Sequence, residues 1–152
     1  MERLDTFKHI PRYDTLNIYD NYLQVRQLMG ESNTILYSCE ATKFNRYGFK
    51  QKRFLIVTEE HIWVLEQAEH NFAEHRRVPI TQIDAFTVST LPDCQELIIH
   101  VKNDYDDRYL FELPFHKKNL MNVMKFVLKC LNREYAYFEV PSGNLRLYTT
   151  SK

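Results

Sequence analysis

A long amphipathic helix is predicted near the end of this chain, after a series of short segments with strand character. Between Lys117 and Asn132, apolar residues recur at steps of three and four. They form a single stripe, made up of Leu120, Val123, Met124, Val127, Leu128 and Leu131. Because a helix with one apolar stripe must bury it against another layer, we expect this helix to pack on a β-sheet.

Seven short segments precede this helix, and turn residues separate most of them. The predicted strands are residues 35–44, 53–58, 61–66, 76–78, 85–90, 97–101 and 109–113. The polar stretch 67–75 is interpreted as a loop, and a last pair of strands is expected at 135–140 and 145–148. A short helix is expected at residues 20–29, where Asp20 can cap its start and Gly30 can stop it.

Seven strands followed by one amphipathic helix are typical of a pleckstrin-homology-like barrel. The expected fold class is therefore mainly β with α: about seven antiparallel strands in two sheets, capped by the C-terminal helix, with a short N-terminal helix. A chain of 152 residues is long enough for one domain with its own core. We expect an N-terminal extension at residues 1–32 and the barrel domain at residues 33–152.

A concentrated basic segment lies between the first two predicted strands. Five of the eleven residues from 43 to 53 are basic and none is acidic: Lys43, Arg46, Lys50, Lys52 and Arg53. Gly48 marks a turn in the middle of the segment. A cationic hairpin on a β-scaffold is typical of a binding site rather than a catalytic one.

Several blocks of the sequence resemble the tail homology one domain of class I myosins, a pleckstrin-homology-like module. Residues 43–65 resemble its basic hairpin and the apolar strand after it, residues 77–83 resemble a basic-x-Pro-Ile-x-x-Ile segment, and Phe138-Glu139-Val140 resembles the strand after its helix. The likeness covers about residues 33–150 and leaves out residues 1–32. No motor or calmodulin-binding neck accompanies it, so we expect a free-standing copy of the domain.

The resemblance implies a binding site for anionic lipid headgroups on the basic hairpin. In that family, a Lys on the first strand and a basic-x-Arg pair on the second contact the lipid, and Lys43 and Arg53 match the outer positions. Gln51 departs from the pattern, and Lys50 and Lys52 on either side are candidates to compensate for it. A phosphoinositide site made of Lys43, Arg46, Lys50, Lys52 and Arg53 is therefore one hypothesis.

Charge outside the hairpin favours a second hypothesis, docking to a protein. Residues 54–116 carry four basic and twelve acidic side chains, which opposes approach to an anionic bilayer. The uneven charge suits a specific partner better than nucleic acid, which we exclude as a partner. Aromatic residues of the N-terminal extension are candidate partner anchors: Phe7, Tyr13, Tyr19 and Tyr22. The alternative is that the ends of the chain fold back on the barrel.

The sequence contains no pattern of a catalytic, cofactor or metal site. No nucleophile elbow, phosphate loop or HExxH motif is present, and the six His residues lack ligand spacing. Cys39, Cys94 and Cys130 are widely spaced and odd in number, which indicates a reducing, cytoplasmic location. We therefore expect no enzyme activity, no cofactor and no metal.

The favoured function is that of a structural or adaptor subunit that binds protein partners in a cytoskeletal assembly, with the ciliary axoneme as one candidate setting. The alternative is a phosphoinositide-binding module that places a partner at a membrane.

Overall fold

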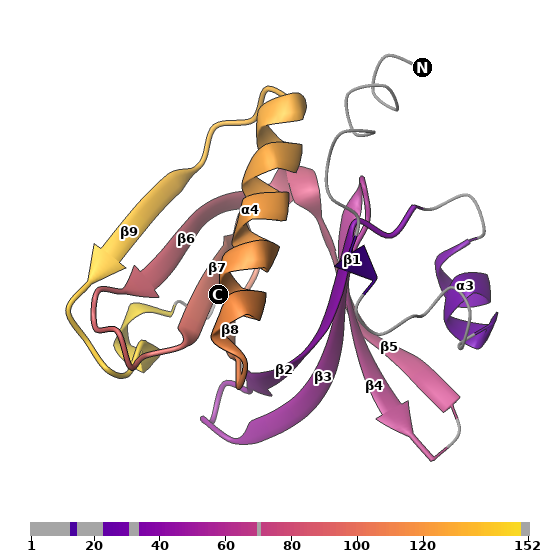
Figure 1. The fold of residues 1–152 in the computed structure, drawn as a ribbon, viewed down its shortest axis with the longest axis horizontal. Coiled ribbons are helices and arrows are strands. Elements are labelled where there is room, and N and C mark those ends of the chain that lie inside the picture. The colour runs from indigo at the N-terminus through magenta and orange to yellow at the C-terminus, as the bar shows by residue number, and fades with distance from the viewer. Residues whose placement is uncertain (1–12, 15–22, 31–33, 70, 150–152) are drawn as a thin grey trace.

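The computed structural model describes residues 13–14, 23–30, 34–69 and 71–149. One long helix, α4, lies between the two halves of a curved sheet (Figure 1). The strands are β1 (Tyr13–Asp14), β2 (Tyr37–Phe44), β3 (Lys50–Val57), β4 (His61–Ala68), β5 (Asn71–Pro79), β6 (Ile83–Ser89), β7 (Glu96–Val101), β8 (Asp107–Leu110) and β9 (Ala136–Val140). The helical elements are α3 (Leu23–Met29), α4 (Pro114–Cys130) and the 3₁₀ turns η1 (Ile80–Gln82) and η2 (Arg146–Tyr148).

The strands form one open sheet in the order β5-β4-β3-β2-β8-β7-β6-β9, with β1 paired to β2 beside this path. The expected mainly-β fold with one main helix is confirmed, but its strand count and its division into two sheets are not. The described part of the chain has nine strands instead of about seven. Two of its pairs, β1–β2 and β6–β9, are parallel rather than antiparallel.

The expectations for two other stretches were wrong. Residues 67–75 are not a loop, because β4 continues to Ala68 and β5 begins at Asn71. Since β5 is an edge strand, most of its side chains are exposed and its composition resembles that of a loop. Residues 145–148 are not a strand either: they contain η2, and β9 pairs with β6 instead.

The apolar stripe of α4 is buried in the main core, as predicted. Leu120 and Val127 are fully buried, and Leu131, just past the last helical residue, is half-buried against the same core. The helix begins at Pro114 rather than Lys117, because proline suits the first turn, where a backbone N–H would have no partner. Neither α4 nor the other described helix is long and apolar enough to cross a bilayer.

A second apolar cluster lies on the opposite face of β3 and β4, beneath α3. Val25 and Met29 of the helix pack there with Phe54, Trp63 and Phe72 of the sheet. The predicted helix at 20–29 is thus confirmed over its last seven residues, and it ends before Gly30, whose φ is +88°. The proposed cap, Asp20, lies outside the described residues.

Candidate functional site

The basic hairpin is a rigid turn between β2 and β3. Backbone N–H groups of Tyr47 and Phe49 donate to the Asn45 side-chain oxygen at 2.9 and 3.0 Å. Gly48 donates to the Asn45 carbonyl at 2.9 Å and has a φ of +86°, which disfavours side chains larger than hydrogen. One asparagine therefore holds the loop in shape and orients the residues on its tip.

The strand register divides the five predicted basic residues. Lys43 pairs with Gln51, and Arg53 pairs with Ala41, so Lys43 and Arg53 lie on the same, inner face. Both are almost fully buried. Lys50 and Lys52 alternate with them and lie on the outer face, so they do not take the place of Gln51 beside Lys43.

The outer basic residues meet solvent. Lys52 is mostly exposed and forms a 2.9 Å ion pair with Glu40 on the neighbouring strand. Lys50 and Arg46 are exposed as well. The structure thus brings Lys43 and Arg53 together inside the barrel and leaves the other three residues at its surface.

A buried carboxylate, Asp107, and a half-exposed one, Glu66, lie close to the buried basic residues. Asp107 lies 3.4 Å from Lys43 and 2.6 Å from Arg76, while Glu66 lies 3.8 Å from Arg53. Burial lowers the pKa of the Lys43 ammonium, and the nearby Asp107 opposes that shift. A buried charge is stable only when it is paired, so the carboxylate contacts of Lys43 and Arg53 are part of the fold and are present without a ligand.

Arg76 and Asp107 were missed by sequence reasoning. Arg76 begins the predicted strand 76–78, and Asp107 falls between the predicted strands 97–101 and 109–113, so neither was a candidate site residue. Both are almost fully buried, and the Arg76 guanidinium also stacks on the Tyr105 ring, with Cζ 3.6 Å from the ring centroid. No local sequence signal marks this pairing, because the two residues come from β5 and β8.

A pocket of about 440 Å³ opens beside the basic hairpin. Its basic lining residues are Lys43, Arg46, His75, Arg108 and Arg146, and its carboxylate is Asp106. Arg108 is paired with Glu96 and also donates to the Asn144 side chain at 3.1 Å. Asp106 bonds His100 at 2.8 Å. These contacts occupy the charges of Arg108 and Asp106 within the domain.

Arg46 and Arg146 are the charged groups that the pocket keeps available. Arg46 donates to the Tyr47 hydroxyl at 2.8 Å, and Arg146 donates to the Tyr47 carbonyl at 3.4 Å. Among the described residues, neither guanidinium has a carboxylate within ion-pair distance. Two guanidinium groups at one pocket can bind the oxygens of a phosphate. Arg146, far along the chain, was not among the predicted site residues.

His75 adds a titratable group to this pocket. Its pKa is lowered, chiefly by desolvation and further by the charges of Lys43 and Arg53. The imidazole is therefore neutral near pH 7.

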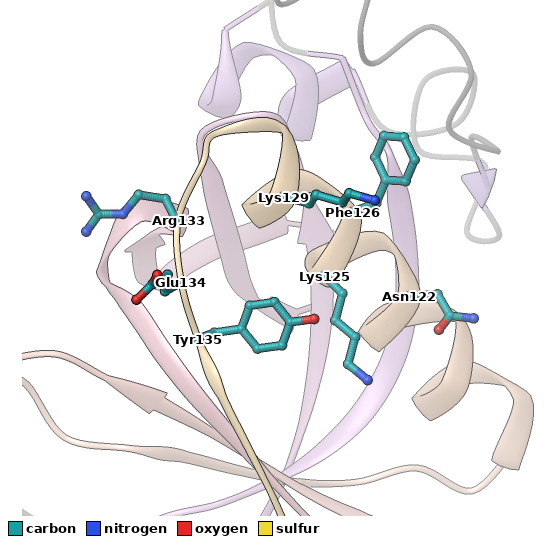
Figure 2. Close-up of a pocket in the computed structure, with 7 residues that line it drawn as sticks. All are labelled: Asn122, Lys125, Phe126, Lys129, Arg133, Glu134 and Tyr135. Carbon is teal, nitrogen blue, oxygen red and sulfur yellow. The ribbon is translucent and has the colours of Figure 1, made fainter.

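A second basic surface lies at the end of α4. Figure 2 shows Lys125, Phe126 and Lys129 on the helix and Arg133, Glu134 and Tyr135 on the segment after it. These residues line a hollow of about 620 Å³. The Lys125 ammonium lies 4.1 Å from the centroid of the Tyr137 ring, and Arg133 donates to the Thr81 carbonyl at 2.9 Å. The surface therefore combines positive charge with aromatic side chains.

Three polar residues on the sheet form a hydrogen-bonded chain. Thr87 Oγ1 lies 2.6 Å from His100 Nε2, and His100 Nδ1 lies 2.8 Å from Asp106 Oδ2. In this order, Thr87, His100 and Asp106 resemble the nucleophile, base and acid of a catalytic triad. However, Thr87 is only 3% exposed, and its strand is covered on one side by β9, where it pairs with Phe138. The three residues therefore form a hydrogen-bonded polar network on the sheet rather than an exposed nucleophile.

The predicted N-terminal anchors cannot be placed as a group. Phe7, Tyr19 and Tyr22 lie outside the described residues. Tyr13 lies in β1, whose backbone pairs with Tyr37 of β2. Their role as partner anchors stays a prediction.

Solved structures similar to this chain share the pleckstrin-homology-like fold. The hSac2 domain of human phosphoinositide phosphatase Sac2 has a TM-score of 0.60 and 7% identity, and the match covers 84% of this chain and 90% of that one. The Slm1-PH domain in complex with D-myo-inositol-4-phosphate has a TM-score of 0.50 and 7% identity, covering 59% and 92%. The DH/PH domains of p115-RhoGEF have a TM-score of 0.57 and 7% identity, covering 84% and 40%. At these identities the likeness shows the fold alone.

No curated protein sequence matches the chain. A protein-family model does match, over residues 13–141, and its description is unconventional myosin tail, actin- and lipid-binding. The match begins earlier than the likeness seen from sequence, at residue 13 instead of about 33, so it includes β1 and α3. The predicted boundary between residues 32 and 33 stays untested. Because the match spans most of the chain and the fold agrees with it, the chain belongs to the family of unconventional myosin tail homology domains.

Proposed function

We propose that this chain is a non-enzymatic binding module that docks on phosphoinositide-bearing membranes through the pocket of Arg46 and Arg146. One observation carries the proposal: these two guanidinium groups face one pocket of about 440 Å³ and have no carboxylate partner among the described residues. Arginine binds phosphate oxygens in pairs and keeps its charge at any physiological pH. A phosphate group is the ligand that this geometry fits best.

Two comparisons support a lipid headgroup as the source of that phosphate. The family to which the chain belongs is described as lipid-binding. A structural neighbour, the Slm1-PH domain, was solved with an inositol phosphate. The proposed site differs from the predicted one. Lys43 lines the pocket, but Asp107 balances its charge, and Arg146 of the C-terminal segment is a new member of the site.

Charge reversal at the pocket tests the proposal. The variant Arg46→Glu with Arg146→Glu should lose sedimentation with phosphoinositide vesicles, because both side chains are exposed and their loss leaves the core intact. Lys102→Glu with Lys118→Glu is the matched control, with the same change of net charge at two exposed sites outside the pocket. Equal loss in both double variants would show that net charge alone, rather than the pocket, attracts the protein to the vesicles.

Wild-type binding should also weaken as salt rises, since charges at the surface are screened within ~8 Å at physiological ionic strength. Wild-type protein that ignores such vesicles at low salt would exclude the lipid function.

A second function, as an adaptor subunit in a cytoskeletal assembly, is favoured by the basic surface in Figure 2. Lys125 and Lys129 lie one helical turn apart on α4, where the Lys125 ammonium lies over the Tyr137 ring and the ring of Phe126 is half-exposed. Positive charge around an aromatic residue fits an acidic protein surface, and the family description includes actin. We propose actin filaments as this partner, which gives the module a cytoplasmic, cytoskeletal location. The ciliary axoneme remains a proposed setting that localisation imaging can test.

Filament sedimentation separates this function from the first. Lys125→Glu with Lys129→Glu should reduce binding to actin filaments and leave vesicle binding unchanged, because the two surfaces share no residue. Deleting residues 1–22 tests the predicted anchors Phe7, Tyr13, Tyr19 and Tyr22 in the same assay. Filament binding that survives both changes would refute the adaptor role at these sites.

A further inference from the structure

The three most exposed large apolar side chains among the described residues lie at one corner of the molecule. Leu147 is 91% exposed, Phe49 is 69% exposed and Tyr47 is 63% exposed. Tyr47 and Phe49 lie on the β2–β3 loop, at the lower edge of Figure 1, and Leu147 lies in η2. Exposing three such side chains together is unfavourable in water, so a functional contact is the simplest explanation.

Arg146 joins the two segments that carry these side chains. Its guanidinium donates to the Tyr47 carbonyl and lies so close to Gly48 that an added Cβ would be 3.2 Å from Nη1. The residue after it is Leu147, so the exposed Leu147 follows directly on the residue that contacts the aromatic loop. Arg146 therefore belongs both to the phosphate pocket and to the apolar corner.

The corner is built in advance of any partner. Asn45 bonds the backbone N–H groups of Tyr47 and Phe49, which keeps both aromatic residues on the tip of the turn. A rigid tip loses little conformational entropy when it enters another phase. The apolar side chains are thus presented outward rather than folded onto the barrel.

The charges around the corner identify its occupant. Arg46 and Arg146 border the apolar side chains, and Lys50 follows Phe49 directly. Apolar and aromatic side chains surrounded by basic ones suit the interface of an anionic bilayer, where rings lie at headgroup level and cations meet phosphates. A protein partner would have to supply an acidic rim and an apolar socket, whereas an anionic bilayer supplies both features anywhere on its surface.

We propose that Phe49, Leu147 and Tyr47 insert into the bilayer interface while Arg46 and Arg146 bind a headgroup phosphate. The inference rests on the proposed lipid function and adds to it a hydrophobic contact. Both residues of the C-terminal segment, Arg146 and Leu147, lie beyond the family match, which ends at residue 141. Tyr47 and Phe49, on the β2–β3 loop, lie within the match.

The test uses the full chain with Phe49→Ala and Leu147→Ala combined. Affinity for phosphoinositide vesicles should fall about tenfold or more, because two apolar side chains no longer leave water. Affinity for a soluble inositol phosphate should stay within about twofold, since the guanidinium groups are intact. Phe115→Ala, on α4 and 51% exposed, is the matched control and should leave both affinities unchanged.

A direct reading comes from Phe49→Trp with brominated lipids. Its fluorescence should be quenched by bromine on the upper acyl chain, whereas Trp63 is buried and should be quenched little. Vesicle affinity unchanged in the double alanine variant, together with an unquenched Trp at position 49, would overturn the insertion and leave the headgroup pocket standing. Wild-type protein that binds neither vesicles nor inositol phosphate would overturn the proposed function as well.

Discussion

The side-chain amide of Gln24 forms two hydrogen bonds with the backbone of Phe72. The Phe72 N–H donates to Gln24 Oε1 at 2.8 Å, and Gln24 Nε2 donates to the Phe72 carbonyl at 3.2 Å. Gln24 in α3 thus pairs with the edge strand β5 as a neighbouring strand would. The Phe72 ring packs on Phe54 at 5.4 Å between centroids. These contacts hold α3 against the edge of the sheet.

Replacing Gln24 with Ala should destabilise the protein by about 1–3 kcal/mol, because two partly buried backbone groups lose their partners. Chemical unfolding measures the loss. Gln27→Ala, at an exposed position on the same helix, is the control and should change the free energy of unfolding by less than ~0.5 kcal/mol. Equal stability of the two variants would show that α3 is not held to β5 by this pair.

Substitutions in the apolar stripe of α4 test whether the helix is buried against the sheet. Leu120→Ala should cost about 2–5 kcal/mol, since it leaves a cavity in a fully buried site, and Val127→Asp should cost more because it buries an unpaired charge. Asn122→Ala on the exposed side is the control. A melting temperature unaffected by Val127→Asp would contradict the burial of the helix against the sheet.

The buried ion network predicts a large effect of one carboxylate. Asp107→Asn should destabilise the fold by about 3–5 kcal/mol, because Lys43 and Arg76 would keep their charges in the interior with a weaker partner. Glu40→Gln, which breaks the exposed pair with Lys52, should cost at most ~1 kcal/mol. If the two changes cost the same, the interior network is not a stabilising unit.

Stability should fall as the pH drops below about 6.5. Desolvation lowers the pKa of His61 and of His116, so both rings stay neutral in the folded protein while the unfolded chain takes up protons from about pH 6.5 downward. Their contribution is therefore complete above that pH and is lost as pH falls through the folded values. His116 Nδ1 also lies 2.5 Å from the Tyr37 hydroxyl oxygen. In the neutral ring this nitrogen can accept a hydrogen bond from the hydroxyl group.

Unfolding free energies measured from pH 7.5 to 5.5 should show this loss, and His116→Asn should make it shallower. Stability that is constant or rising over the same range would contradict the expected linkage.

Features encoded by local pattern were predictable from sequence. The three- and four-residue steps of Leu120 and Val127 predicted the buried face of α4, and the run of basic residues around Gly48 predicted an exposed turn. The burial of Lys43 and Arg53 on one face was not anticipated, because it depends on how β2 and β3 pair.

Features set by register and by distant contacts were not predictable. Arg76 meets Asp107 only because β5 and β8 curve toward one another, and nothing near either residue signals the pair. Arg146 enters the pocket because the C-terminal segment returns to the β2–β3 loop, a contact between residues 47 and 146. Only residues 76–78 of the edge strand β5 were predicted, because an exposed edge needs few apolar residues.

Titration with a soluble inositol phosphate is the most direct test of the phosphate pocket, since it removes the bilayer and any protein partner. We expect wild-type protein to bind with an affinity that falls as salt rises, and Arg46→Glu with Arg146→Glu to bind at least tenfold more weakly. Lys125→Glu with Lys129→Glu, on the other basic surface, should match the wild type. The account would be contradicted if reversal at Arg46 and Arg146 left binding unchanged while reversal at Lys125 and Lys129 removed it.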